Sequence, residues 1–255
     1  MSLVIVKLNV RYARFVMIGA ALLCLLTAWF SLKWNFANMI ASQLEPDKPE
    51  TRLVAPWLAT LSPSDPRTHL SAALAFERSF DMSDVTRALN EYEAAAALSP
   101  EDHFNWLSVG RGRGLNGDAV GAAAAYARAL QLAPNYASVQ WAYGNALVRQ
   151  GQRDEGFGYL AKAAAANRDY SQPAALTALQ ILNGDIDAAR SSLGESDVMT
   201  AALAGALASQ QRFDEAAALW ANLPMEKRAS EFAKLGELMS DQLLKAKQFR
   251  YAAQV

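Results

Sequence analysis

Few side chains in this sequence could carry out catalytic or metal chemistry. The chain has two histidines, His69 and His103, and a single cysteine, Cys24. Neither an H-x-x-x-H nor a C-x-x-C spacing is available, so neither a zinc site nor a dithiol redox centre is expected. The two histidines lie 34 residues apart, and we interpret them as repeated structural residues near helix starts. The sequence therefore predicts no catalytic residue, no metal and no cofactor.

The string Gly110–Gly114 (GRGRG) could suggest a phosphate-binding loop. It follows no predicted strand and lacks the Lys-Ser/Thr ending of such loops, so we interpret it as part of a loosely packed helix beside a groove. The acid pairs Asp154-Glu155 and Asp214-Glu215 fall at expected helix starts, where carboxylates interact well with the helix dipole. We therefore expect the chain not to be an enzyme.

The elements that position these residues are predicted to be helices. Of the 255 residues, 52% are hydrophobic and 19% are charged, and alanine supplies a fifth of the chain. Alanine has the highest helix propensity, whereas valine and isoleucine are sparse after residue 54, which argues against a large sheet. One cysteine excludes a disulfide framework. A net charge of −1 gives no reason to expect nucleic acid as a partner, and no small-molecule substrate is evident.

One segment near the N-terminus is predicted to cross a membrane. Phe15–Leu32 is an 18-residue run without a charge, about 27 Å long as a helix and close to the thickness of a hydrocarbon core. Trp29 and Trp34 lie at its far end, where indoles favour the headgroup layer. We expect residues 15–34 to form a transmembrane helix in contact with the lipid bilayer.

Charge predicts the orientation of this helix. The first 34 residues contain four basic residues and no acidic one, so all 25 acidic residues follow. By the positive-inside bias, segment 1–14 is expected to be cytoplasmic, and the rest of the chain to lie in the periplasm, anchored by a single pass in a bacterial inner membrane.

Two other interpretations of the apolar run fit its residues less well. A cleaved signal peptide usually has a shorter apolar region and a small-x-small site, whereas Met39 stands two places before Ala41, the best candidate. A lipoprotein signal at Cys24 would need small residues before it, and Leu22 and Leu23 stand there instead. A membrane anchor is the preferred interpretation.

Residues 35–66 are predicted to form a proline-rich linker, in which a short helix near Trp57–Leu61 is allowed and the membrane helix can continue to Gln43. Proline interrupts long helices because it lacks an N–H and restricts the residue before it. The prolines of this segment are Pro46, Pro49, Pro56, Pro63 and Pro66.

A 34-residue period follows the linker. Such a period is the signature of stacked helix–turn–helix units, and Asn116-Gly117-Asp118 predicts a tight turn within one of them. The recurring positions are Pro66, Pro100 and Pro134; Tyr92, Tyr126 and Leu160; Ala95, Ala129 and Ala163; and Gly110 and Gly144.

The unit 103–136 resembles the tetratricopeptide repeat (TPR), and weaker units extend the resemblance over about 67–223. It departs from the family at Arg113, where tyrosine is usual. The matching residues are Trp106, Val109 and Gly110 of the W-x2-L-G opening, Ala122 and Tyr126 of the A-x3-F pair, and the closing Pro134.

The resemblance implies an all-α fold, in which one transmembrane helix precedes a right-handed superhelix of helical hairpins. The repeat domain is expected at 67–225 and a C-terminal capping helix at 226–255. The sequence ends in an apolar stretch, 249–255, without a capping signal, so we expect a neighbouring domain beyond it.

In this family the first helix of each hairpin lines a concave groove that holds a peptide or a partner helix. The resemblance therefore implies a partner-binding groove, although Trp141 can instead belong to the core and Arg149 can be a solvated charge. The groove residues carried over are Glu77, Phe80, Phe104, Leu107, Arg111, Trp141, Asn145 and Arg149.

We expect a scaffold or adaptor that brings protein partners to an envelope machine. The layout is similar to that of anchored repeat proteins of exopolysaccharide or O-antigen assembly. Two alternatives stay open: a cytochrome c maturation adaptor, and an accessory subunit of a larger membrane complex, which Gly19, Ala20 and Ala21 could contact through a surface of small residues.

Overall fold

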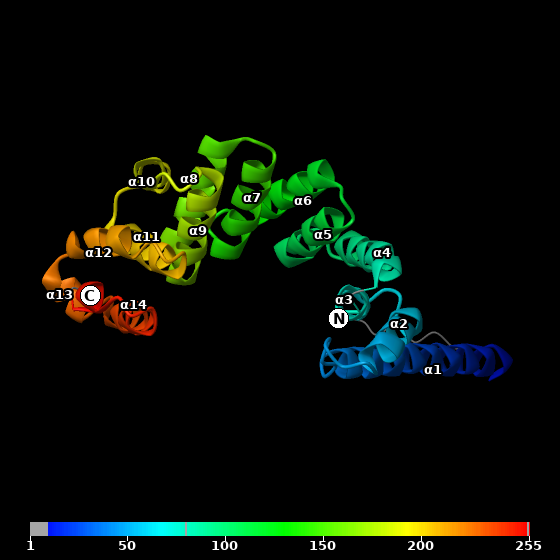
Figure 1. Ribbon diagram of the computed structural model, residues 1–255. Coiled ribbons are helices and arrows are strands. Elements are labelled where there is room, and N and C mark those ends of the chain that lie inside the picture. The colour runs from blue at the N-terminus through cyan, green and yellow to red at the C-terminus, as the bar shows by residue number, and fades with distance from the viewer. Residues whose placement is uncertain (1–9, 80, 254) are drawn as a thin grey trace, which may run out of the picture. The chain divides into compact units, whose positions relative to one another are not determined.

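The computed structural model describes residues 10–79, 81–253 and 255. All regular elements among these residues are helices (Figure 1), so the predicted all-α class is confirmed. The chain forms two compact units, residues 1–100 and 101–255, and each is described by itself.

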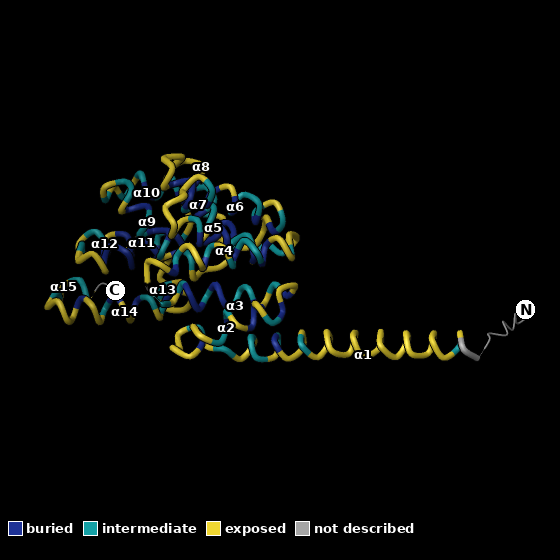
Figure 2. Tube along the Cα trace, turned by 90° about the vertical axis from the view of Figure 1, so that its right-hand side faces the viewer, coloured by how far each residue is buried: buried dark blue, intermediate teal, exposed yellow. Residues whose placement is uncertain are grey.

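The first unit consists of one long helix and three shorter ones. The long helix is exposed along most of its length (Figure 2), and an 18-residue stretch of it, with a mean hydropathy of 2.2, is apolar enough to cross a membrane. Its last turns pack on the next two helices, and Ala37 is fully buried there. The helices are α1 (Val10–Ala41), α2 (Thr51–Leu61), α3 (Pro66–Glu77) and α4 (Met82–Leu98).

Helix α2 lies within the segment that the sequence predicts to be a linker, and it is longer than the short helix expected there. Pro56 stands inside it and removes one helical hydrogen bond. One face of the helix is nevertheless buried, with Thr51, Ala55, Leu58 and Ala59 against the rest of the unit, chiefly α3. Burial of this face outweighs the lost hydrogen bond, so this half of the segment packs as part of the first unit.

The second unit is a series of helical hairpins, as the TPR resemblance predicts. Each first helix packs against the helix that follows it, and α7, α9 and α11 also contact the neighbouring hairpin. The helices are α5 (His103–Leu115), α6 (Ala119–Leu132), α7 (Ala137–Arg149), α8 (Arg153–Ala166), the 3-10 turn η1 (Arg168–Tyr170), α9 (Ser171–Ile181), α10 (Ile186–Leu193), α11 (Asp197–Ser209), α12 (Phe213–Ala221), α13 (Met225–Ala229), α14 (Ala233–Lys245) and α15 (Phe249–Ala252).

The turn predicted at Asn116-Gly117-Asp118 is present, and two further hairpins have a glycine at the corresponding point of their turns. Gly117, Gly151 and Gly184 have φ values of 83°, 84° and 80°, a left-handed conformation that glycine adopts at no steric cost. After two of these turns, the side chains of Asp118 and Asp185 accept hydrogen bonds from the backbone N–H groups of Gly121 and Ala188, in the first turns of α6 and α10. These caps stabilise the second helix of each hairpin.

The first hairpin is not in the same register as the others. Its capping residue, Asp65, precedes Asp102 by 37 residues, whereas Asp102 and the cap of α7, Tyr136, are 34 residues apart. Helix α4 has 17 residues and α6 has 14, which accounts for the difference. His69 is therefore the fourth residue of α3 and His103 the first residue of α5, so the two histidines are not equivalent as the 34-residue spacing suggested.

Small residues allow close helix contacts in the second unit. Residues 201–208 of α11 are all buried, and five of them are alanines. The backbone of Gly144 in α7 lies so near α8 that an added Cβ would be 2.9 Å from the carbonyl oxygen of Gly156. Such packing leaves no room for larger side chains, which explains the high alanine content.

The C-terminal segment contains three helices instead of the single capping helix expected at 226–255. Helix α14 packs on α11 and α15 on α14. The buried Trp220 of α12 donates a hydrogen bond from Nε1 to the carbonyl oxygen of Val255 over 3.2 Å. This segment covers the apolar face of α11 and α12 that the last hairpin would leave open.

Candidate functional site

Of the two residues predicted for the groove in the first unit, Glu77 is engaged within its own hairpin. Its carboxylate accepts a 2.5 Å hydrogen bond from the hydroxyl of Tyr92, which is fully buried. This contact ties the end of α3 to α4. Phe80 lies outside the described residues.

Phe104 lies in an aromatic cluster at the start of α5. It is 53% exposed, and its ring centroid is 4.1 Å from that of His103 and 6.3 Å from that of Tyr136. The His103 and Tyr136 rings are 4.7 Å apart. An exposed aromatic held by two other rings is a suitable contact for an apolar partner side chain.

Leu107 and Arg111 follow Phe104 along the same face of α5 but differ in burial. Leu107 is half-buried and packs, with Trp106, against the cluster of Ala129, Ala133 and Val139. Arg111 is exposed. Leu107 therefore contributes to hairpin packing as well as to the surface.

The three predicted residues of α7 also have different surroundings. Trp141 is half-buried, packs against the main core and stacks on Tyr170 with a centroid distance of 5.2 Å and an angle of 31°. Asn145 donates from Nδ2 to the carbonyl oxygen of Trp141, 2.9 Å away in the same helix. Arg149 is exposed at the end of α7. Of the three, Trp141 has the strongest structural role.

The sequence did not predict the apolar hollow between α9, α11 and α14. This α11–α14 hollow has a volume of about 330 Å³, and first helices of successive hairpins line it. Leu238 stands at its edge and is 53% exposed. The apolar residues that line the hollow are Val198, Ala201, Ala202, Phe232, Leu235 and Leu238.

Polar groups surround the α11–α14 hollow on one side. Arg168 and Glu231 form an ion pair of 2.6 Å at its rim. The hydroxyl of Ser171, at the start of α9, is buried and has no hydrogen-bond partner among the described residues. Because this oxygen is covered by its neighbours, the ion pair of Arg168 and Glu231 is a polar group that a ligand in the hollow can reach.

A second ion pair lies on the surface next to the α11–α14 hollow. Lys227 donates to Asp197 at the start of α11 over 2.6 Å, and the hydrogen bond to this carboxylate raises the pKa of Lys227. It links α13 to the start of α11, next to the hollow.

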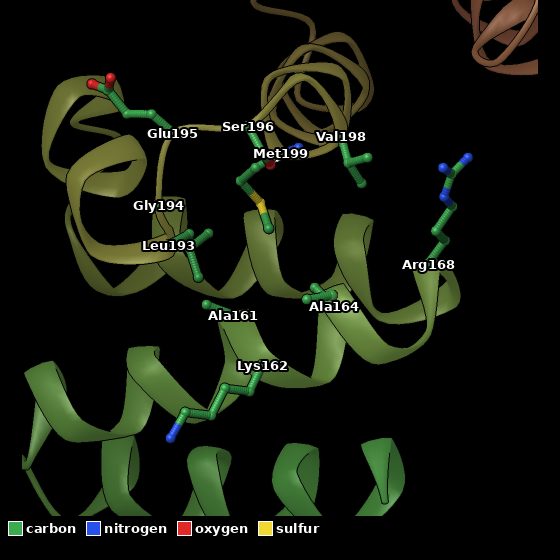
Figure 3. A pocket seen from close by; sticks show the side chains of 11 residues that line it. Ala161, Lys162, Ala164, Arg168, Leu193, Gly194, Glu195, Ser196, Val198 and Met199 are labelled. Atoms are coloured by element: carbon green, nitrogen blue, oxygen red, sulfur yellow. Dashed lines mark hydrogen bonds between the residues drawn. The ribbon is translucent and has the colours of Figure 1, made fainter. Parts of the chain in front are cut away.

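A larger hollow lies beside it, between the end of α8 and the loop before α11 (Figure 3). Its volume is about 540 Å³, and Figure 3 shows Ala164, Leu193 and Met199 lining it and Lys162 and Glu195 at its edges. Arg168 lines both hollows. Surface that could receive a partner is therefore concentrated in the second half of the array.

The sequence contained one signal for this region. Phe232, Leu235 and Leu238 recur at helical spacing, and this pattern predicted a helix but not its packing on α11. Among the described residues, no group of three His, Cys, Asp or Glu side chains converges as a metal site would require.

No protein-family model matches the sequence, and no curated protein matches it. The structure is similar to a crystal structure of MamA, with 15% identity, a TM-score of 0.45, and coverage of 55% of this chain and 81% of that one. It is also similar to YrrB, a TPR protein with an unusual peptide-binding site, with 15% identity, a TM-score of 0.43, and coverage of 78% and 86%. A third match is the hetero-tetramer Cut9-Hcn1 of APC/C, at 15% identity and a TM-score of 0.47, covering 81% of this chain and 42% of that one.

Proposed function

We propose that the chain is a membrane-anchored adaptor that binds a protein partner through its helical hairpins. The α11–α14 hollow is the observation that carries this proposal. It exposes apolar side chains from neighbouring hairpins next to an ion pair and a buried hydroxyl without a partner. Apolar pockets with a few polar groups are typical binding sites.

The chemistry of the hollow indicates what it would bind. Val198, Ala202 and Leu235 form an apolar floor that suits one or two aliphatic or aromatic side chains of a peptide or a helix. The exposed Phe104 and the half-buried Trp141 would extend the contact along the array, as the sequence predicted for the groove.

Helix α1 would supply the anchor. Its exposed apolar surface and length satisfy the requirement for a single span, and the basic residues before it would place the repeats in the periplasm. A signal sequence has the same properties, so retention of α1 in the mature protein is part of the proposal. The anchored layout supports a role in envelope or exopolysaccharide assembly as the pathway.

Substitution of two leucines of α14 tests whether the α11–α14 hollow binds the partner. Leu238 lines the hollow, whereas Leu244 is 48% exposed on α14 and does not line it. Leu238→Glu should abolish recovery of the partner when the full-length protein is purified from gently solubilised membranes, and Leu244→Glu should preserve it. Equal recovery with both variants, or no stable partner with the unaltered protein, would exclude the hollow as the binding site.

Topology needs a separate experiment. In a Cys24→Ala background, a cysteine introduced at the exposed Ala165 of α8 should react with a membrane-impermeant reagent in intact spheroplasts. Reaction only after lysis would reverse the orientation. Loss of the protein from washed membranes would show that α1 is not an anchor.

A further inference from the structure

The chain folds back beside the outer end of the apolar part of α1. The turn that joins α2 to α3 and the end of α2 form a small hollow together with α1, about 280 Å³ in volume. From α1 it is lined by Phe30, Ser31, Lys33 and Trp34; from the returning segment it is lined by Leu61, Ser62, Pro63 and Ser64. Residues 61–64 therefore lie at the level of Phe30–Trp34 along α1.

This level coincides with the boundary of the hydrocarbon core, on the premise that α1 spans the membrane as proposed above. The uncharged run ends at Leu32, and Lys33 is the first charged residue after it. A span that begins at Phe15, directly after Arg14, and follows the uncharged run for about 27 Å ends at Leu32, close to the far boundary of a hydrocarbon core of about 30 Å. Ser62–Ser64 must then lie in the headgroup layer.

Helix α2 presents aromatic and apolar surface at the same end. Trp57 is 51% exposed although it belongs to a packed helix, and Leu61 follows it by four residues, on the same face. Trp29 and Trp34 of α1 are also exposed. Indole rings favour the interface between headgroups and acyl chains, so this arrangement is suited to a lipid surface.

Several polar groups of the turn are hydrogen-bonded within the protein. The carbonyl oxygen of Ser62 accepts a hydrogen bond from Thr68, and that of Pro63 lies 3.1 Å from Nε2 of His69. Asp65 accepts from the backbone N–H of Arg67. Because the carbonyls of Ser62 and Pro63 are bonded within the protein, bringing this part of the turn close to lipid costs less desolvation free energy than it would with unbonded carbonyls.

We propose that the α2 end of the first unit, with Trp57, Leu61 and the turn 62–64, rests on the lipid headgroup layer beside α1. The inference depends on the proposed membrane anchor and adds a second lipid contact to it. This contact would fix the orientation of the first unit against the bilayer, so that α1 is a rigid support and not a loose tether.

Depth measurement on the full-length protein tests this contact. Single cysteines are introduced as Trp57→Cys, Thr60→Cys and Leu98→Cys in a Cys24→Ala background, and the native Cys24 serves as a fourth position. Thr60 is exposed on α2, and its variant keeps Trp57 in place; Leu98 is exposed at the end of α4 and is the control. Each variant carries an environment-sensitive dye and is reconstituted in phosphatidylcholine vesicles that contain a nitroxide quencher either in the headgroup or deep in the acyl chain.

We expect the headgroup quencher to act more strongly on dyes at positions 57 and 60 than on the dye at 98, and the deep quencher to act on the dye at Cys24. If Cys24 is quenched from within the bilayer but positions 57 and 60 behave like 98, the lipid contact is wrong and the anchor stands. If the dye at Cys24 is not quenched either, the proposed anchor itself is wrong. The dyes at positions 57 and 60 could also be shielded from water in native membranes without being quenched in vesicles of pure lipid. This result would mean that another protein covers this face, and it would overturn the proposal.

Discussion

Glu91 on α4 pairs with His69 on α3, with 2.6 Å between its Oε2 and Nδ1 of the imidazole. The other ring nitrogen lies 3.1 Å from the carbonyl oxygen of Pro63. Because both nitrogens face acceptors, the imidazolium, which has two N–H donors, satisfies both bonds. The pKa of His69 is raised, chiefly by the hydrogen bond with Glu91. Burial lowers this pKa, and the hydrogen bond with the carbonyl oxygen of Pro63 raises it further.

This pair predicts a pH-dependent stability. Since the pKa of His69 is higher in the folded than in the unfolded chain, the pair stabilises the fold fully below about pH 6.5, the ordinary pKa of histidine, and the contribution is lost as the pH rises through the folded-state pKa. His69→Gln should therefore lower the free energy of unfolding most at acid pH. Urea unfolding of both proteins in detergent across a pH series measures this difference.

His103→Gln is the matched control for this experiment because it removes a histidine and leaves the pair with Glu91 intact. A difference between wild type and His69→Gln that stays constant with pH, or that grows as the pH rises, would contradict the assignment of His69 as an imidazolium.

The buried carboxylate of Asp84 leads to a second prediction, which concerns the stability of the first unit. Its side chain is 0% exposed, and its oxygens lie 2.6 Å from Arg52 of α2 and 3.0 Å from Arg87. Arg52→Met keeps the aliphatic stem but removes the charge that ties α2 to α4. We expect a loss of about 2 kcal/mol in the free energy of unfolding, and faster hydrogen exchange in α2.

Arg78→Met provides the comparison for Arg52. Arg78 lies 3.4 Å from Asp47, and both side chains are exposed, so this ion pair should contribute about 0.5 kcal/mol or less. Equal effects of the two substitutions would show that burial of Asp84 does not strengthen its bond to Arg52.

Two of the three groove candidates of α7, Trp141 and Arg149, should respond differently to truncation to alanine. Trp141 stacks on Tyr170, so Trp141→Ala should cost about 1–3 kcal/mol of stability, whereas Arg149→Ala should leave stability unchanged. If both belong to the groove, both should weaken recovery of the partner from solubilised membranes. Loss of binding with Trp141→Ala alone, in proportion to its loss of stability, would assign this residue to the core.

Local signals explain why the hairpins could be predicted from the sequence. The turns at Gly117 and Gly151 need a left-handed residue, and glycine there marks each hairpin directly. The alanine content likewise predicted close packing, and the bulk of α11 is alanine and leucine.

Features that depend on distant contacts were predicted less well. The prolines predicted a linker, but the buried face of Ala55 and Leu58 exists only because α3 covers it. The extra residues of α4 changed the register of the first hairpin. The α11–α14 hollow depends on how Leu235 packs against α11, which no local pattern reveals.

Gly144, which recurs 34 residues after Gly110, should be needed for the close packing of α7 on α8. The substitution Gly144→Ala tests this. An added Cβ would lie 2.9 Å from the carbonyl oxygen of Gly156 and 3.0 Å from Leu160. The nearest atom belongs to the backbone and cannot rotate away, so we expect a loss of about 1–3 kcal/mol from overpacking. Thermal unfolding monitored by circular dichroism measures it.

Gly158→Ala, in the helix that Gly144 contacts, should have the opposite effect. A Cβ at Gly158 would meet no atom within 4 Å, so only helix propensity changes, and the substitution should stabilise the unit by about 0.5–1 kcal/mol. Gly110→Ala is expected to lie between the two, because the atoms nearest to its Cβ would belong to the ring of Tyr126, a side chain that can move. If Gly144→Ala were as stable as Gly158→Ala, α7 and α8 would not approach as closely as Gly144 and Gly156 indicate.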